Sequence, residues 1–261
     1  MCRFTPFILG SICLHAGMLA LVVFSPDKWL TALVVLLTNH AAIGMAGLLP
    51  RSQLLGPNLV HLSDEAAKRG EVALTFDDGP DPETTPKILK ILEQYDVQAT
   101  FFCIGEQAQA HPEICREIMS GGHDIENHGQ RHQNHLAFSG FNGWMREVGQ
   151  GQKTIENITG KCPKFYRALA GLRNPFLDPI LQNLGIHLIS WTRRGYDTRC
   201  GNPDVVLFRL IRGLKAGDIL LLHDGHSARS KSGNPVVLEV LPRLLCELKR
   251  QNLKPIPLRA S

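Results

Sequence analysis

The stretch Leu74-Thr75-Phe76-Asp77-Asp78-Gly79-Pro80 joins a short β-prone run to a turn that carries two adjacent carboxylates. Gly-Pro ends the strand, because proline lacks the backbone N–H that pairing requires, and the turn lets both acids reach one cleft. Neighbouring carboxylates repel each other unless a cation lies beside them. A metal ion bound to one acid would leave the other free as a base, whereas the simpler alternative is an Asx turn or a helix cap.

Outward from this stretch, β-prone runs alternate with helix-like segments. The segment Pro86–Tyr95, for example, places Ile88 and Leu92 on one helical face. The alternation predicts an α/β fold with a parallel sheet, either open and doubly wound or closed into a barrel. In both folds, ligands gather at the carboxyl ends of the strands. The seven β-prone runs are Val72–Phe76, Ala99–Ile104, Asp124–Asn127, Lys164–Arg167, Ile186–Trp191, Ile219–Leu222 and Pro255–Leu258.

The N-terminal segment differs in composition, since Phe7–Phe24 and Trp29–Leu49 contain no charged residue. A helix needs about 20 apolar residues to cross a bilayer, so the two runs predict a transmembrane helical hairpin. The alternatives are a secretory signal in the first run, or a packed core helix in the second, which contains Asn39 and His40. We therefore expect a membrane anchor over residues 1–50, a linker over 51–70 and one α/β domain over 71–258.

Charge and cysteine patterns indicate the compartment. Arg3 precedes the first run and Arg51 follows the second, while the turn between the runs has no net charge. Because positive flanks stay in the cytoplasm, we expect a bacterial inner-membrane protein whose domain faces the cytoplasm. The seven cysteines include no C-x-x-C pair, which favours reduced, buried thiols.

The overall composition excludes several classes of protein. The 44% hydrophobic content excludes a disordered chain. The net charge of +4 is spread along the sequence, whereas a nucleic-acid binder needs a concentrated basic stripe. Membrane lipid is thus an expected partner and nucleic acid is not, and the sequence indicates no protein partner.

Three histidines follow the third β-prone run, in Asn127-His128-Gly129-Gln130-Arg131-His132-Gln133-Asn134-His135. A spacing of four places His128 and His132 on one side of a helical turn, within reach of one metal ion. Neutral imidazole suits zinc and similar divalent ions. The pattern predicts a metal site, with His135 as a rival third ligand that spacing alone does not exclude.

One carboxylate and two imidazoles leave open positions on a metal ion, which is typical of a catalytic site. Such an ion lowers the pKa of bound water and polarises a carbonyl, and a second carboxylate can accept the water's proton. The leaving group then needs a proton donor on its opposite side. Leu220-Leu221-Leu222-His223-Asp224 ends the sixth run with a suitable histidine, although a structural His223 is an equal alternative.

These motifs resemble the polysaccharide deacetylase family, whose shared catalytic region is called the NodB homology domain. Thr75–Pro80 matches the first family motif, Asn127–His132 matches the second in both histidines, and Leu220–Asp224 matches the last. The resemblance covers residues 71–258 and implies a distorted (β/α) barrel of about seven parallel strands.

The resemblance also implies catalytic roles. Asp77 would be the general base, and Arg167 would orient and ionise it through a charge-assisted contact. His223 would be the general acid, held protonated by Asp197, which stands six residues after Trp191.

The remaining roles concern the metal and the substrate. The implied cofactor is one divalent ion, zinc first, with cobalt, nickel or manganese as alternatives. The implied ligands are Asp78, His128 and His132, and the implied substrate pocket contains Leu221, Tyr166 and Trp191.

Two motifs depart from the family pattern. Ala168 and Leu169 replace the paired prolines that follow the motif-three arginine, in a loop whose backbone helps to bind the oxyanion. Thr198 replaces the aromatic residue after Asp197, and Arg193-Arg194-Gly195-Tyr196 precedes that aspartate. These changes affect the sugar-binding wall rather than the metal ligands, so we expect ordinary chemistry on an unusual substrate.

The predicted function is that of a metal-dependent hydrolase of linear amide C–N bonds. It would remove an N-acetyl or N-formyl group from an amino sugar, in a polysaccharide or a lipid-linked glycoconjugate. The alternative is a catalytically silent glycan-binding or scaffold protein that retains the deacetylase fold. A metal-dependent phosphatase or nuclease would require more carboxylate ligands and a second metal ion.

Overall fold

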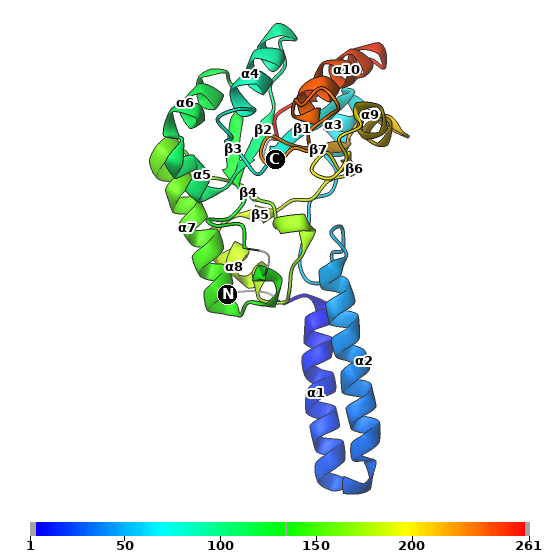
Figure 1. Cartoon of the computed structure of the whole chain (residues 1–261). Coiled ribbons are helices and arrows are strands. Elements are labelled where there is room, and N and C mark those ends of the chain that lie inside the picture. Colours follow the sequence, from blue (N-terminus) through cyan, green and yellow to red (C-terminus); the bar gives the residue numbers. More distant parts are fainter. Residues whose placement is uncertain (1–3, 134, 259–261) are drawn as a thin grey trace.

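The computed structural model describes residues 4–133 and 135–258, so Arg3 and Asn134 lie outside the described residues. A two-helix hairpin extends away from an α/β domain (Figure 1). Its helices are α1 (Pro6–Phe24) and α2 (Trp29–Leu48), joined by the short 3-10 turn η1 (Pro26–Lys28). The Thr5 hydroxyl caps α1 by accepting a hydrogen bond from the Ile8 N–H. The two apolar helices agree with the predicted hairpin.

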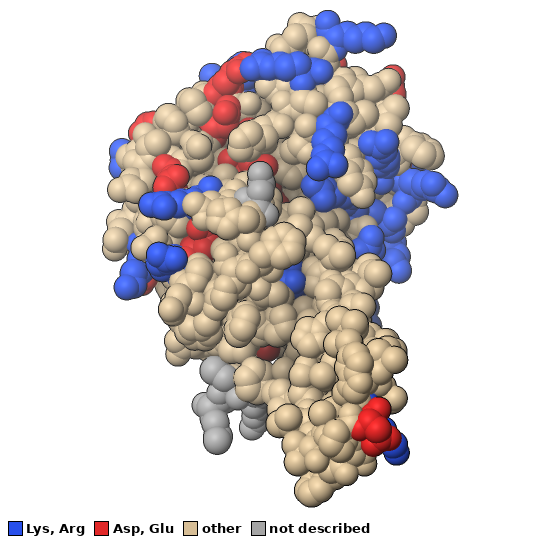
Figure 2. Space-filling view, turned by 60° about the horizontal axis from the view of Figure 1, so that its bottom comes forward, with Lys and Arg blue, Asp and Glu red and all other residues tan. Residues whose placement is uncertain are grey.

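The hairpin leaves most of its apolar surface uncovered. Both helices are long and apolar enough to cross a membrane, and only 11% and 17% of their most apolar windows are buried. Figure 2 shows no charge along the hairpin except at its tip, where η1 contributes Asp27 and Lys28. Within the described residues, most of the surface of these helices is therefore left without a protein cover.

The domain is built on one sheet whose strands are all parallel. The strand order is β5-β4-β3-β2-β1-β7-β6, and β8 pairs with the first residues of β1. The sheet curves into a half-barrel, so the expected distorted barrel is confirmed in an open form. The strands are β1 (Glu71–Asp77), β2 (Thr100–Cys103), β3 (Asp124–Asn127), β4 (Phe165–Tyr166), β5 (His187–Leu188), β6 (Arg193–Arg194), β7 (Ile219–His223) and β8 (Lys254–Ile256).

The predicted single strand Ile186–Trp191 is wrong in one respect. The chain forms β5 at one edge of the sheet, crosses the open side and forms β6 at the other edge. Linker residue Leu59 takes the pairing positions beyond β5, because its carbonyl accepts the Ser190 N–H at 2.9 Å. The Thr192 N–H then bonds to the Ile219 carbonyl at 2.9 Å, which places the chain beside β7.

Helices cover the outer face of the sheet. Alternation along β1 directs Leu74 and Phe76 toward the helices, where they join a core that includes Ile88 and Leu244. The helices are α3 (Asp64–Lys68), α4 (Thr85–Gln94), α5 (Gly105–Ala110), α6 (Pro112–Ser120), α7 (Phe141–Thr159), α8 (Leu177–Leu184), α9 (Pro203–Ile211) and α10 (Val236–Arg250), with short 3-10 turns η2 (Leu136–Phe138) and η3 (Leu169–Gly171).

The parallel arrangement brings three chemically important strand ends together. Asp77 ends β1 and is in register with His223, which ends β7. On the other side of β1, β2 connects it to β3, whose last residue Asn127 precedes His128. The motifs that are far apart in the sequence therefore meet at one edge of the sheet, as the carboxyl-end rule predicts.

The hairpin is joined closely to the domain. The Arg173 N–H donates to the Gly47 carbonyl at 3.1 Å near the end of α2. A Cβ at Gly47 would collide with the Arg173 carbonyl oxygen, whereas one at Gly44 meets nothing within 4 Å. The Ser190 hydroxyl donates to the Pro50 carbonyl at 2.6 Å, so the start of the linker is also fixed to the sheet.

We expect Gly47→Ala to destabilise the full-length protein by about 1–3 kcal/mol, because backbone must move to admit the new methyl group. Thermal unfolding in detergent and limited proteolysis of the linker measure this effect. Gly44→Ala, three residues earlier in the same helix, is the matched control and should leave both readouts unchanged. Equal behaviour of the two variants would contradict the close contact between α2 and the domain.

Candidate active site

Asp77 lies beside a buried arginine. Nη1 of Arg167 donates to Asp77 Oδ1 at 2.7 Å and to Thr75 Oγ1 at 2.8 Å. Thr75 and Asp77 point to the same face of β1, so one guanidinium reaches both. The Arg167 side chain is fully buried, and its charged group lies 4.1 Å from the centre of the Phe102 ring. A charge-assisted contact of this kind holds Asp77 in one orientation.

Asp78 turns away from that pair and toward two imidazoles. Its φ angle of 76° lies in the left-handed region, where few non-glycine residues occur, so the turn reverses the direction of its side chain. Asp78 Oδ1 lies 3.2 Å from Nε2 of His128 and 3.0 Å from Nε2 of His132. The sequence thus places two adjacent carboxylates in different environments.

The three side chains fit a divalent metal ion. Their ligand atoms lie within 4.8 Å of one another. Asp78 Oδ1 and His132 Nε2 are buried and have no hydrogen-bond partner among the described residues. Nδ1 of His128 donates to the Arg167 carbonyl at 2.8 Å, which leaves Nε2 free as a ligand. One carboxylate oxygen and two imidazole nitrogens are a donor set that suits zinc.

Two further histidines differ in their relation to this group. His135, the rival ligand, is exposed and does not belong to it. His226, which the sequence analysis missed, lies with Nδ1 3.5 Å from Asp78 Oδ2. Burial alone would raise the pKa of Asp78, but the nearby imidazoles of His128, His132 and His226 hold it well below its usual range. Asp78 is therefore ionised, as a metal ligand must be.

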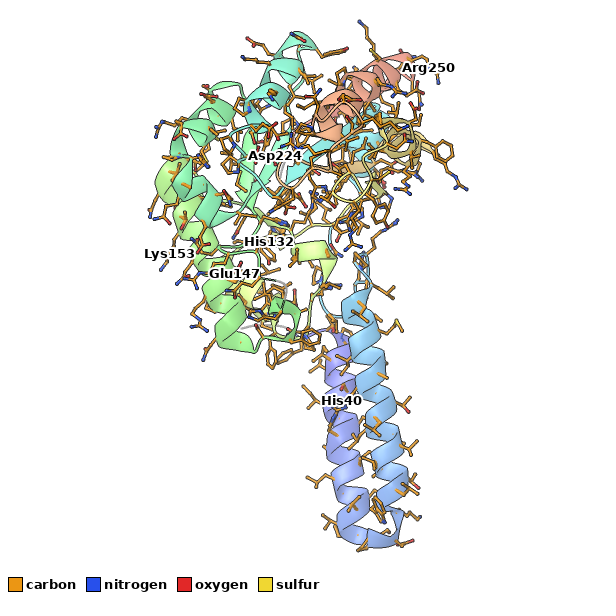
Figure 3. The ribbon with its side chains drawn as sticks, in the orientation of Figure 1. His40, His132, Glu147, Lys153, Asp224 and Arg250 are labelled. Carbon is orange, nitrogen blue, oxygen red and sulfur yellow. The ribbon has the colours of Figure 1, made fainter. Side chains whose placement is uncertain are left out.

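A loop on the other side of His128 is fixed by Glu147. Its Oε1 accepts the backbone N–H groups of Arg131 and His132, each at 2.8 Å. Figure 3 shows His132 and Glu147 close together, with Glu147 projecting from α7. Gly129, at φ 89°, permits this approach, because a Cβ there would lie 2.6 Å from the carboxylate. A loop, rather than the predicted helical spacing, thus brings His128 and His132 together. Glu147 of helix α7 holds this loop in place.

His223 forms a second buried pair with Asp197. Nδ1 of His223 lies 2.8 Å from Asp197 Oδ1, and the His223 N–H donates to Oδ2 of the same carboxylate at 2.8 Å. Burial by itself would lower the pKa of His223, but the charge and hydrogen bond of Asp197 raise it above the ordinary value. The geometry therefore favours a protonated imidazole whose Nε2 remains free to donate.

Asp224 fixes the turn beneath the two acids. Thr85 donates its hydroxyl proton to Asp224 Oδ2 at 2.6 Å, and the Asp224 N–H donates to the Asp77 carbonyl at 3.1 Å. Burial raises the pKa of Asp224 to about 7. A Cβ at Gly79 would collide with this carboxylate, so the glycine of the first motif is required by packing.

The metal group and His223 open on one cleft of about 720 Å³. Asp78, His132 and His223 line it together with loop residues Leu169 and Ala170. The three residues expected to form the substrate pocket do not line this cleft. Their side chains are buried, with exposures of 1% for Leu221, 1% for Tyr166 and 5% for Trp191, and their role in a pocket stays a prediction.

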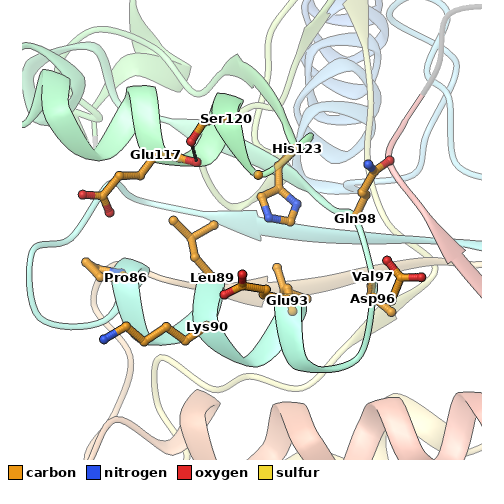
Figure 4. A pocket seen from close by; sticks show the side chains of 12 residues that line it. Pro86, Leu89, Lys90, Glu93, Asp96, Val97, Gln98, Glu117, Ser120 and His123 are labelled. Atoms are coloured by element: carbon orange, nitrogen blue, oxygen red, sulfur yellow. Dashed lines mark hydrogen bonds between the residues drawn. The ribbon is translucent and has the colours of Figure 1, made fainter.

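A second pocket, of about 480 Å³, lies between α4 and α6 (Figure 4). His123 lines it, just before β3, so the pocket lies at the opposite end of the strands from the metal group. Nδ1 of His123 accepts the Ala99 N–H at 3.2 Å, and burial lowers the pKa of this imidazole. A neutral, hydrogen-bonded histidine of this kind has a structural role.

Comparison with known proteins shows the family to which the chain belongs. The family model described as polysaccharide deacetylase matches residues 64–189. A peptidoglycan-N-acetylglucosamine deacetylase of Bacillus cereus is 32% identical over 185 residues, which cover 70% of this chain and 84% of the relative. A chitooligosaccharide deacetylase of Azorhizobium caulinodans is 30% identical over 158 residues, which cover 60% of this chain and 75% of the relative.

Solved structures share the fold. The crystal structure of a peptidoglycan N-acetylglucosamine deacetylase bound to an N-hydroxybenzamide has a TM-score of 0.69 and 27% identity, and the match covers 77% of this chain and 90% of that one. A pseudoenzyme of carbohydrate esterase family 4 from Bacillus anthracis has a TM-score of 0.68 and 23% identity, over 77% of this chain and 67% of that one. The latter likeness concerns the fold alone.

We expect His132→Ala to lower zinc affinity by on the order of a hundredfold or more, because loss of even an outer partner of a ligand costs about 10–100-fold. Titration of the full-length protein with zinc, in competition with a coloured chelator, measures this loss. His135→Ala is the matched control and should bind zinc as the wild type does. Loss of zinc from the His135 variant would instead support the rival ligand.

We expect Asp197→Asn to lower the pKa of His223, since an amide cannot stabilise the imidazolium as the carboxylate does. The protonated fraction of His223 at neutral pH then falls, and any activity that needs the protonated form is lost at lower pH than in the wild type. A histidine NMR titration measures the pKa directly. The control is Asp204→Asn, which removes an exposed partner of Arg243. An unchanged His223 pKa in the Asp197 variant would refute the assigned pairing.

Proposed function

The chain belongs to the polysaccharide deacetylase family, and on that basis we propose that it is a metal-dependent hydrolase that removes an N-acyl group from an amino sugar. The observation that carries the proposal is the division of the two adjacent acids. Asp77 is paired with Arg167, whereas Asp78 faces two imidazoles. One acid is thus placed as a base and the other as a ligand.

Each residue of the proposed site has a defined part in this reaction. A divalent ion held by Asp78, His128 and His132 would supply Lewis acidity for the amide carbonyl and the attacking water. Asp77, held in place by Arg167, accepts the proton of the water whose oxygen bonds to the carbonyl carbon. His223 donates its proton to nitrogen as the C–N bond breaks, so that acetate and a free amine leave.

The loop after Arg167 is placed to bind the oxyanion that forms on the carbonyl. Leu169 and Ala170 line the cleft, and Ala170 and Gly171 have positive φ angles of 50° and 73°. A Cβ at Gly171 would collide with Pro50, so the linker supports the loop from behind. In other family members two prolines follow the arginine, and here Ala168 and Leu169 replace them. We propose that packing against Pro50 stiffens this loop in their place.

We also propose that the hairpin anchors the protein in a membrane. Phe138 and Phe176 are exposed by 90% and 48%, and Asn174 links their two loops through hydrogen bonds to the Ala137 and Ser139 carbonyls. Asn174 follows Arg173, which bonds to the end of α2. Exposed phenylalanines on this side suit the boundary between headgroups and acyl chains that the hairpin would reach.

The orientation follows the positive charges that flank the spans, with the domain in the cytoplasm. In that orientation a lipid-linked amino sugar at the inner leaflet is the substrate, whereas an external domain would act on peptidoglycan or a chitin-like glycan. A reporter fused to the C-terminus decides between them, because cytoplasmic and external reporters give opposite signals.

The second candidate function is a silent glycan-binding protein of the same fold. The described site retains the proposed base, all three proposed ligands and the proposed acid. This alternative is therefore favoured only if these residues prove inactive. Acetate release is the reaction that separates the two.

We expect acetate release from N-acetylated sugars, both neutral and phosphorylated, to stop after chelation and to return with added zinc. Asp77→Asn should lower kcat by about 10²–10⁴-fold, because it removes the general base. Glu113→Gln, a change of an exposed acid on α6, is the control and should leave kcat unchanged. Glycan binding without acetate release, indifferent to chelation, would favour the silent alternative.

A further inference from the structure

The arginines of β6 have separate surroundings. Adjacent strand residues point to opposite faces, so Arg193 and Arg194 diverge. Nε of Arg193 lies 2.8 Å from Asp218 Oδ2, and its Nη1 donates to the Arg212 carbonyl at 2.8 Å. Arg193 is therefore neutralised within the protein, whereas Arg194 lines the catalytic cleft.

Aromatic rings hold the Arg194 guanidinium in place. Its central carbon lies 5.1 Å from the centre of the Trp191 ring and 5.0 Å from that of Tyr196. Such contacts hold a guanidinium over the aromatic rings. They leave the N–H groups at its edge free to donate hydrogen bonds. Trp191 thus helps to hold the Arg194 side chain in place, although Trp191 does not line the cleft itself.

Arg194 has no anionic partner. Within residues 4–133 and 135–258 it forms no ion pair, and its buried Nε has no hydrogen-bond partner. The acids that line the cleft are engaged elsewhere: Asp78 faces imidazoles, and Glu106 pairs with Arg131 at 3.0 Å. Because Arg194 lines the cleft without an ion-pair partner among the described residues, an anionic ligand there would supply the missing opposite charge.

The unpaired charge lies close to the reacting groups. Burial lowers the pKa of Arg167, Asp77 opposes that effect, and the like charge of Arg194 adds to it. Arg194 therefore acts electrostatically on the residue that holds the base. Arg199 lines the same cleft and supplies a second guanidinium. Two guanidiniums suit a phosphate, which accepts several charge-assisted hydrogen bonds.

We propose that Arg194 binds an oxyanion group of the substrate, so that the acylated amino sugar is phosphorylated or carries a carboxylate. The inference rests on the proposed function and narrows its substrate class to anionic amino sugars. Phosphate is the favoured group because of the second guanidinium, and a phosphate that links the sugar to a lipid satisfies the same chemistry as a free sugar phosphate.

The test compares three sugars on the zinc-loaded, full-length protein in detergent: N-acetylglucosamine, its 1-phosphate and N-acetylmuramic acid, which bears a carboxylate. Calorimetric or NMR titration of the zinc-loaded Asp77→Asn form, whose hydrolysis is slowed, gives each Kd with little turnover. Hydrogen bonds to charged groups contribute about 1.5–3 kcal/mol, so the phosphate should bind about ten- to a hundredfold more tightly than the neutral sugar. The ratio for N-acetylmuramic acid distinguishes carboxylate from phosphate recognition.

Arg194→Met should reduce the preference for the charged sugar to less than about threefold, while Arg194→Lys keeps part of it. Arg209→Met is the matched control, since Arg209 lies 5.6 Å from the same Tyr196 ring but does not line the cleft. The control should retain the full preference. Equal unfolding temperatures for the variants show that each has folded.

Two binding results, either of them sufficient, overturn the inference: equal binding of all three sugars by the wild type, or an equal loss of preference in the Arg194 and Arg209 variants. Acetate release from neutral and charged sugars at the same efficiency would also refute it, while leaving the proposed hydrolysis intact. Conversely, Arg194-dependent binding of the phosphate without any acetate release supports the anionic site and refutes the proposed hydrolysis.

Discussion

The fully buried guanidinium of Arg167 is the contact on which the rest of the site depends. It joins Thr75 and Asp77 of β1, and its own carbonyl accepts the Nδ1 proton of His128. A buried carboxylate without this partner would be an uncompensated charge, which a protein interior tolerates only at high cost. One residue therefore orients the proposed base and fixes the tautomer of His128, a proposed metal ligand.

Given that pair, the conflict between Asp77 and Asp78 is resolved by geometry. The positive φ of Asp78 sends the second carboxylate toward His128 and His132, while the first stays with its arginine. Two groups of identical intrinsic acidity thus acquire different tasks because their neighbours differ. Asp224 and Gly79 support the turn from below, which explains why packing tolerates only glycine there.

The linker and hairpin are part of this arrangement rather than appendages to it. Leu59 pairs at the edge of β5, and Pro50 lies behind the loop that borders the cleft. If the hairpin lies in a membrane, the wall of the cleft is tied directly to the membrane surface. An anionic sugar held there by a lipid would meet both the anchor and the Arg194 guanidinium, and this is the physical link between the localisation and the substrate that we propose.

The sequence by itself determined the elements and the chemical inventory. Periodicity identified the parallel sheet, the apolar runs identified both hairpin helices, and motif spacing selected His128 and His132, because these signals are local along the chain. The resemblance to the family selected Asp78 as the third ligand. Only the tertiary structure decided which local candidates meet. Hydrogen bonds to Leu59 and Ile219 divided the predicted Ile186–Trp191 strand, Glu147 of a distant helix shaped the histidine loop, and Asp218 paired with Arg193 rather than Arg194. Such contacts join residues far apart in sequence, and no local pattern encodes them.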